Sequence, residues 1–99
     1  MSDNELQQLR TEIDNLDEEL IRILGQRFIA TEKVGHIKAA QSLAAVDPAR
    51  EAAQAQRYSL LAGHNNLKDE LVQKVFRAII DEVVSNHQTI RNVRQDPAS

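Results

Sequence analysis

A run of regularly spaced apolar residues between positions 6 and 41 constrains the fold of this chain more than any other feature. The steps alternate between three and four residues, the spacing of a helix that buries one seam. The seam residues are Leu6, Leu9, Ile13, Leu16, Leu20, Ile23, Ala30, Val34 and Ile37. A helix of roughly 36 residues is over about 50 Å long, whereas a domain of this size has a radius of gyration of about 13 Å. The helix therefore needs a partner, and a second copy of the chain is the simplest one.

The composition favours an all-α fold in a single domain that covers residues 1–99. Aromatic residues make up only 3 % of the 99 residues, so the core has to be built from aliphatic side chains. Such a core suits packed helices better than a β-sandwich. A chain of this length has a modest core of its own, which dimerisation would enlarge.

The charge and the apolar pattern weigh against several classes of partner. The net charge is −3, whereas binding to nucleic-acid phosphates requires a basic surface. No apolar run approaches the length of a membrane span, and the acidic N-terminus does not have the form of a signal peptide. We therefore expect a cytoplasmic protein with no nucleic-acid and no membrane partner.

Metal ions and cofactors are not expected either. The chain has no Cys, which excludes a disulfide framework and thiolate chemistry. The three His residues, His36, His64 and His87, do not stand at a familiar metal-binding spacing from carboxylates. We expect neither a metal site nor a cofactor.

A second, shorter helix is expected after the long one, which should end near residues 40–42. Asp47 can cap the second helix, and Pro48 suits its first position because its missing N–H is not needed there. The helix should cover residues 48–62 and end at Gly63, since glycine commonly follows the last helical residue.

A third, longer helix completes the expected fold. Asn66 can cap it, and paired apolar residues recur on each turn over residues 67–92. Such pairs make a wide stripe that is buried on more than one side. The predicted order is a long, a short and a long helix, with no strand.

Three basic residues of the long helix do not fit a purely structural seam. Arg27 occupies a seam position that should be apolar. Lys38 lies about three turns later, so both side chains share one face and can converge on a ligand. Arg10 lies about 100° around the helix from Arg27, so in a dimer it could serve the pocket of the partner chain.

Further polar residues stand on the other two helices. Asp47, Arg50 and Glu51 have the spacing i, i+3 and i+4 and share one face, at a helix N-terminus that also favours anions. On the third helix, His87 lies four residues after Val83 and points with the apolar stripe.

Each of these residues also has a structural interpretation. The seam arginine Arg27 could fix the register of the helix through a carboxylate partner. The others could be a solvated lysine (Lys38), a helix cap (Asp47), a surface ion pair (Arg50 and Glu51) and a core histidine (His87). Taken together, several cations and two carboxylates in an aliphatic helical protein predict a pocket for a small, multiply charged anion with a hydroxyl group.

The segments that carry these residues resemble the all-helical, AroQ-class chorismate mutases. Residues 25–38 are similar to the R…VGxxK segment of that family, and residues 47–51 to the D/P-x-R-E start of its second helix. Residues 9–17 resemble its opening helix, and residues 76–80 the F…II of its third helix. The resemblance covers about residues 6–90 with the spacings intact.

The resemblance implies an intertwined helical homodimer with two sites, each made of residues from both chains. Members of the family convert chorismate to prephenate by a Claisen rearrangement, in the biosynthesis of phenylalanine and tyrosine. By this resemblance, Arg27 and Arg10 of the partner subunit would bind the two substrate carboxylates, aided by Arg50. A pericyclic step of this kind needs neither a nucleophile nor a metal.

The resemblance also assigns the remaining residues, with one departure from the family pattern. Lys38 would donate to the ether oxygen as the C–O bond breaks, while Asp47 and Glu51 would hold the ring hydroxyl. The second donor to the ether oxygen is usually Gln or Glu; here that position is His87, and Val83 stands where some members carry Ser. A protonated His87 would be the better donor, which predicts a rate that rises as the pH falls.

Three alternatives remain open at this point. An isochorismate-pyruvate lyase, of a salicylate or siderophore pathway, has a similar fold and cationic pocket, although Glu51 favours a mutase. An aminochorismate mutase is a lesser variant. A non-catalytic helical dimer would instead pair Arg27 with a carboxylate in the seam, and Arg27→Leu would then stabilise the protein.

Overall fold

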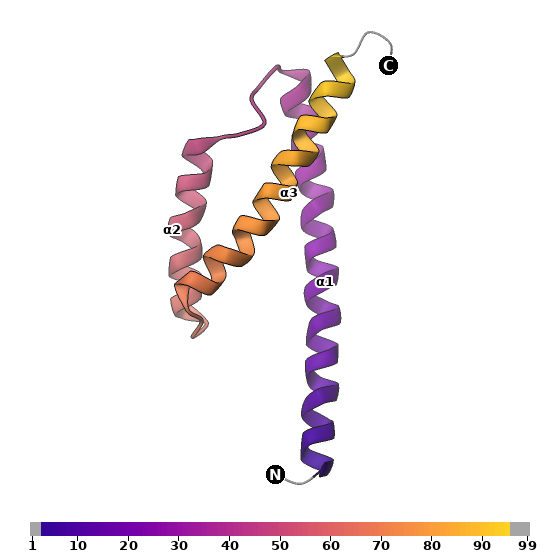
Figure 1. The fold of residues 1–99 in the computed structure, drawn as a ribbon, viewed down its shortest axis with the longest axis vertical. Coiled ribbons are helices and arrows are strands. Elements are labelled where there is room, and N and C mark those ends of the chain that lie inside the picture. Colours follow the sequence, from indigo (N-terminus) through magenta and orange to yellow (C-terminus); the bar gives the residue numbers. More distant parts are fainter. Residues whose placement is uncertain (1–2, 96–99) are drawn as a thin grey trace. The chain divides into compact units, whose positions relative to one another are not determined.

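The computed structural model describes residues 3–95 and contains three helices in this range, with no strand among them (Figure 1). They are α1 (Asp3–Ala40), α2 (Pro48–His64) and α3 (Asp69–Gln95). The predicted all-α fold and its order of a long, a short and a long helix are confirmed. The chain divides into two compact units between Thr31 and Glu32, and α1 contributes to both.

The unit that ends at Thr31 is the first part of α1, and its apolar seam is exposed. Exposed fractions lie between 40 % and 66 % for Leu6, Leu9, Ile13, Leu16, Leu20 and Ile23. Full burial of such a side chain stabilises a protein by about 1.5–3 kcal/mol. A single copy of the chain lacks this stabilisation, because the seam is exposed. None of the helices within residues 3–95 combines the length and the apolar character of a membrane span.

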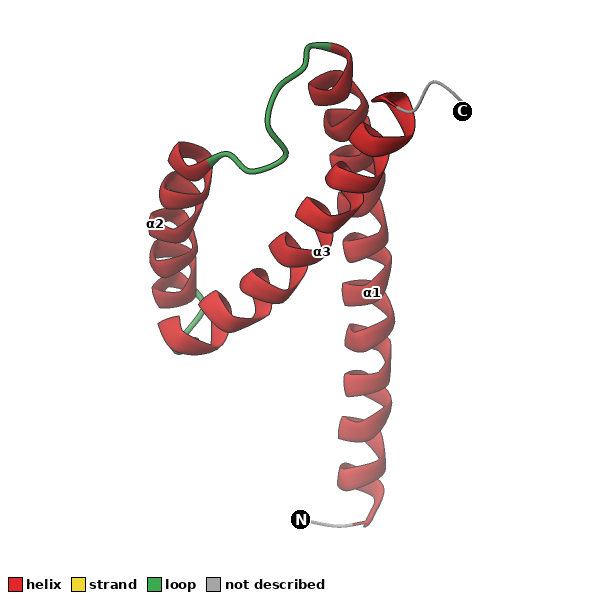
Figure 2. Cartoon of the chain, turned by 45° about the horizontal axis from the view of Figure 1, so that its top comes forward, coloured by secondary structure: helices red, strands yellow, loops and turns green. Residues whose placement is uncertain are grey.

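In the second unit, α1 ends within the predicted range, in a Schellman motif. Ser42 adopts a left-handed conformation with φ of 56°. The Leu43 N–H donates to the Lys38 carbonyl at 2.8 Å, and the Ser42 N–H donates to the Ala39 carbonyl at 3.2 Å, the two bonds that define this motif. The chain then leaves the helix into the loop of residues 41–47 (Figure 2).

The predicted start of α2 is confirmed. Asp47 is the N-cap residue, and its Oδ1 accepts a hydrogen bond from the Arg50 N–H at 3.1 Å. Pro48 occupies the first helical position. Since the first N–H groups of a helix lack partners within the helix, such a cap contributes about 1 kcal/mol.

The end of α2 differs from the prediction. Gly63 lies inside the helix and does not have a positive φ, whereas Asn66 has φ of 57°. The Leu67 N–H donates to the Ala62 carbonyl at 2.9 Å, so Asn66 occupies the left-handed position expected for Gly63. The predicted end at Gly63 and the predicted cap by Asn66 are both wrong, because asparagine also tolerates this conformation. α3 begins at Asp69 instead.

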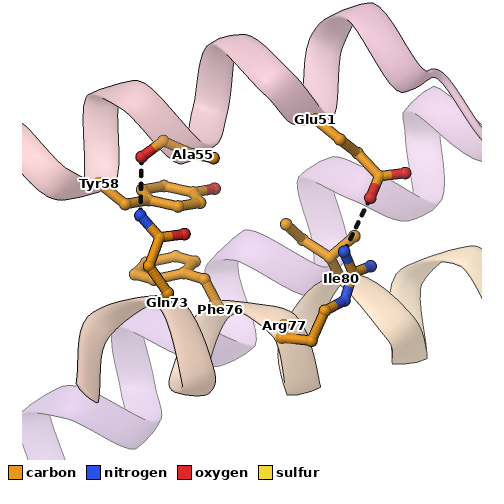
Figure 3. A pocket seen from close by; sticks show the side chains of 7 residues that line it. All are labelled: Glu51, Ala55, Tyr58, Gln73, Phe76, Arg77 and Ile80. Carbon is orange, nitrogen blue, oxygen red and sulfur yellow. Dashed lines mark hydrogen bonds and ion pairs between the residues drawn. The ribbon is translucent and has the colours of Figure 1, made fainter. Parts of the chain in front are cut away.

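Contacts between aromatic and amide side chains hold α2 against α3. The rings of Tyr58 and Phe76 are stacked, with centroids 4.0 Å apart and an interplanar angle of 18°, and Tyr58 is buried. Gln73 Nε2 donates to the Ala55 carbonyl at 2.8 Å (Figure 3). These contacts set the register in which the first turns of α2 face α3.

Candidate functional site

The predicted site residues fall in both units of the chain. Arg10 and Arg27 lie on α1 before Glu32; Arg10 is exposed and Arg27 is half-buried. The unit that begins at Glu32 carries the other six, which are Lys38, Asp47, Arg50, Glu51, Val83 and His87. This second unit thus carries predicted cations, carboxylates and an imidazole on segments of all three helices.

Lys38 is held at the end of α1 by the loop that follows it. Its Nζ donates to the Ala45 carbonyl at 3.4 Å, and the residue is half-buried. This bond holds the ammonium group against the loop two residues before Asp47, the N-cap residue of α2. A cation in the last turn of a helix is also favoured by the helix dipole.

The first turn of α2 presents both carboxylates of the predicted set. Asp47 uses Oδ1 for the cap bond, which confirms its structural interpretation and leaves Oδ2 outside this bond. Arg50 is exposed, and Glu51 is half-buried with 24 % of its side chain exposed. The free N–H groups of the helix start add a partial positive charge that favours anions.

Glu51 forms an ion pair with Arg77, a residue that the sequence patterns do not mark. Nη1 of Arg77 donates to Oε1 of Glu51 at 3.0 Å (Figure 3). Asp81 Oδ1 accepts from Nε of Arg77 at 2.9 Å and lies 2.8 Å from its Nη2. The hydrogen bonds to Glu51 and Asp81 raise the pKa of Arg77 above its ordinary value. The i, i+4 spacing of Arg77 and Asp81 is visible in the sequence, but the pairing with Glu51 depends on how α2 packs on α3.

His87 is packed inside the second unit. Only 5 % of its surface is exposed, so the predicted orientation with the apolar stripe of α3 is confirmed. Its ring lies against Gly35 of α1, where an added Cβ would stand 2.6 Å from the His87 Cδ2 atom. Val83, one turn earlier on α3, is half-buried. A contact of either residue with a substrate stays a prediction.

A small hollow lies between α2 and α3 beside the Glu51–Arg77 ion pair (Figure 3). Its volume is about 50 Å³, whereas pockets for small molecules usually measure about 300–1,000 Å³. The hollow has room for ordered water but not for a substrate. A site built on Glu51 therefore extends beyond this hollow.

The chemistry that this arrangement can perform is binding and polarisation of an anion. Lys38 and Arg50 supply positive charge, and Asp47 and Glu51 supply acceptors for a hydroxyl group. Across residues 3–95, no three His, Asp or Glu side chains are grouped so that they could hold a metal ion.

Comparisons with known proteins identify the relatives of the chain. A sequence model of the family described as chorismate mutase type II matches residues 9–88, a range that contains all of the predicted site residues. The chain is similar to the T-protein of Haemophilus influenzae, with 35 % identity over 81 residues that cover 82 % of this chain and 22 % of the T-protein.

Two further relatives carry the same printed name, bifunctional chorismate mutase/prephenate dehydratase. The protein of Buchnera aphidicola is 29 % identical over 89 residues, which cover 90 % of this chain and 23 % of the relative. The protein of Aquifex aeolicus is 43 % identical over 47 residues, which cover 48 % of this chain and 13 % of the relative. The chain therefore spans less than a quarter of the length of these curated relatives.

Proposed function

The chain belongs to the chorismate mutase type II family, and we propose that it converts chorismate to prephenate in the biosynthesis of phenylalanine and tyrosine. The observation that carries the proposal is the position of Lys38. Its ammonium group donates to the carbonyl of Ala45, two residues before the N-cap Asp47 of α2, which supports a site that combines this cation with the acidic first turn of α2. The proposal concerns mutase activity alone, because the chain spans only 22 % and 23 % of the first two relatives.

In the proposed reaction, one C–O bond of the substrate breaks while one C–C bond forms, and no proton is transferred. The protein has to hold the substrate in the compact conformer in which the reacting carbons meet. Negative charge develops on the ether oxygen as its bond to carbon breaks. Lys38 is the proposed donor to this oxygen, because a cation held where charge develops lowers the barrier most effectively. His87 is the proposed second donor.

The proposed carboxylate ligands are arginines. Arg27 and Arg10 of the partner subunit would bind the two substrate carboxylates, and Arg50 would assist them. The planar guanidinium group suits this role, because it can donate two parallel hydrogen bonds to one carboxylate.

The ring hydroxyl of the substrate is assigned to the carboxylates at the start of α2. Asp47 and Glu51 each have one oxygen in a described hydrogen bond, Oδ1 and Oε1 respectively. The second oxygen of each carboxylate is the proposed acceptor. Val83 would line the pocket on the side of α3.

The proposed working unit is a homodimer with sites shared between the chains. The exposed seam of residues 6–23 supports this, and so does an apolar groove of about 290 Å³ on α2 and α3. The groove is lined by Leu61, Ala62, Asn65, Leu67, Leu71, Val72, Val75 and Phe76. Mutual burial of such surfaces would supply the stability that a chain of this size lacks. We further propose a cytoplasmic location, which the composition without Cys supports.

The test is to incubate the purified protein with chorismate and, separately, with isochorismate, and to identify the products by chromatography. Prephenate from chorismate is the expected result. Pyruvate and salicylate from isochorismate, without prephenate, would make the protein an isochorismate-pyruvate lyase. No turnover of either substrate would favour the non-catalytic helical dimer.

A further inference from the structure

The ion pair between Glu51 and Arg77 links the proposed hydroxyl site to a residue of α3 that has no assigned role. Arg77 lies on the face of α3 that packs against α2, beside the small hollow between the two helices (Figure 3). Its Nη1 donates to Oε1 of Glu51 at 3.0 Å. The bond joins two helices that are distant in sequence, so it depends on the folded unit.

The other edge of the Arg77 guanidinium is anchored on its own helix. Nε donates to Oδ1 of Asp81 at 2.9 Å, and Nη2 lies 2.8 Å from the same oxygen. The guanidinium group is planar and its N–H groups point in fixed directions. An anchor at Nε and Nη2 therefore determines where Nη1 points, which is at Glu51.

The exposure of the three side chains suits a positioning role. Glu51 is the most enclosed, with 24 % of its side chain exposed, whereas Arg77 is 53 % exposed and Asp81 is 66 % exposed. Arg77, which binds the Glu51 carboxylate, and Asp81, which binds Arg77, are thus both more exposed than that carboxylate. A half-buried carboxylate with one oxygen held by such a pair has a preferred orientation for its second oxygen.

We propose that Arg77 is a positioning residue that holds Oε1 of Glu51 and so directs Oε2 toward the ring hydroxyl of the substrate. This inference rests on the proposed function, in which Glu51 binds that hydroxyl. Asp81 supports the arrangement by fixing the guanidinium group. Because Arg77 acts through Glu51, its removal weakens substrate binding and leaves the reacting C–O and C–C bonds untouched.

The experiment measures KM and kcat for chorismate in Arg77→Gln, Arg77→Lys and Asp81→Asn. Loss of an interaction that stabilises the bound substrate and the transition state equally raises KM without changing kcat. An exposed ion pair contributes little free energy. We therefore expect KM for chorismate to rise by about threefold in Arg77→Gln. Arg77→Lys keeps the charge and should recover part of this loss, and Asp81→Asn should give a smaller rise.

Arg57→Gln is the matched control, because it removes the same charge from an exposed position on α2. It should leave KM unchanged. A double-mutant cycle with Glu51→Gln isolates the coupling. In the Glu51→Gln background, Arg77→Gln should produce no further rise in KM.

The possible results separate this inference from the proposed function. Normal KM in Arg77→Gln, with an active unmodified protein, would overturn the positioning role alone. The positioning role would also be overturned if Arg77→Gln raised KM by the same factor in the unmodified protein and in the Glu51→Gln variant, because Arg77 would then act independently of Glu51. Absence of chorismate turnover in the unmodified protein would overturn the proposed function and the positioning role with it.

Discussion

The ring of His87 lies directly against Gly35, so that α3 and the last turns of α1 meet at a residue without a side chain. Both residues are buried, His87 with only 5 % exposed. A Cβ on residue 35 would stand 2.6 Å from Cδ2 of His87 and 3.0 Å from Cδ1 of Ile90. The imidazole therefore occupies the space that a side chain at position 35 would need.

Gly35→Ala should destabilise the protein although alanine is the better helix former. The steric overlap forces His87 or the helix to move, at a cost of about 1–3 kcal/mol. The gain in helix propensity offsets about 1 kcal/mol of this. We expect a net loss of about 1 kcal/mol in the free energy of unfolding, measured by urea denaturation at one fixed protein concentration.

Gly63→Ala is the matched control for this prediction. An added Cβ at Gly63 meets no atom within 4 Å, and its φ is not positive. We expect a gain of about 0.4–1 kcal/mol in the free energy of unfolding. A gain of similar size in Gly35→Ala would contradict the close packing of His87.

His87→Gln should retain mutase activity and lose part of the pH dependence. A protonated His87 would be the better donor to the ether oxygen, so the rate of the unmodified protein should rise as the pH falls. Glutamine donates a hydrogen bond without titrating. The profile of kcat/KM against pH should flatten in His87→Gln but not in the control His64→Gln, whose residue is exposed. Parallel profiles in all three proteins would rule out His87 as the second donor.

Lys38→Met should lower kcat by about 100-fold or more, because it removes the charge proposed to stabilise the ether oxygen. Its bond to the Ala45 carbonyl is long, at 3.4 Å, so the stability of the fold should change little. Lys33→Met removes the same charge from an exposed position of α1 and serves as control. Equal rates in the two variants would exclude the proposed role of Lys38.

Arg27→Leu distinguishes an enzyme from a purely structural helical dimer. Loss of a proposed carboxylate ligand should lower kcat/KM by about 100-fold or more. The measurement is the rate of prephenate formation, together with urea denaturation of the same variant. A more stable variant with an unchanged rate would show that Arg27 has only a structural function in the seam.

The sequence predicts those features that depend on residues close together in the chain. The helix start at Asp47 and Pro48 follows from local hydrogen bonding, and the buried orientation of His87 follows from the period of the apolar stripe. The predicted end of α2 is wrong because glycine and asparagine, here Gly63 and Asn66, both suit a left-handed position, and only the folded chain selects between them.

The ion pair of Glu51 and Arg77 illustrates what local pattern cannot predict. The partners stand 26 residues apart, and their distance depends on the packing of α2 on α3 through the ring stack of Tyr58 and Phe76. The sequence interpretation placed Glu51 beside Arg50 as an alternative surface pair. The structure instead directs Glu51 toward α3.

Complementation between two variants tests most directly whether chorismate is converted at a site shared between two copies of the chain. Arg10→Ala and Lys38→Met should each be inactive, since each removes a residue from every site. Co-expression of the two variants should form mixed dimers in which one of the two sites carries neither substitution. Random pairing then predicts about a quarter of the prephenate formation of the unmodified protein. No activity in mixed dimers that are verified to form would contradict the shared site.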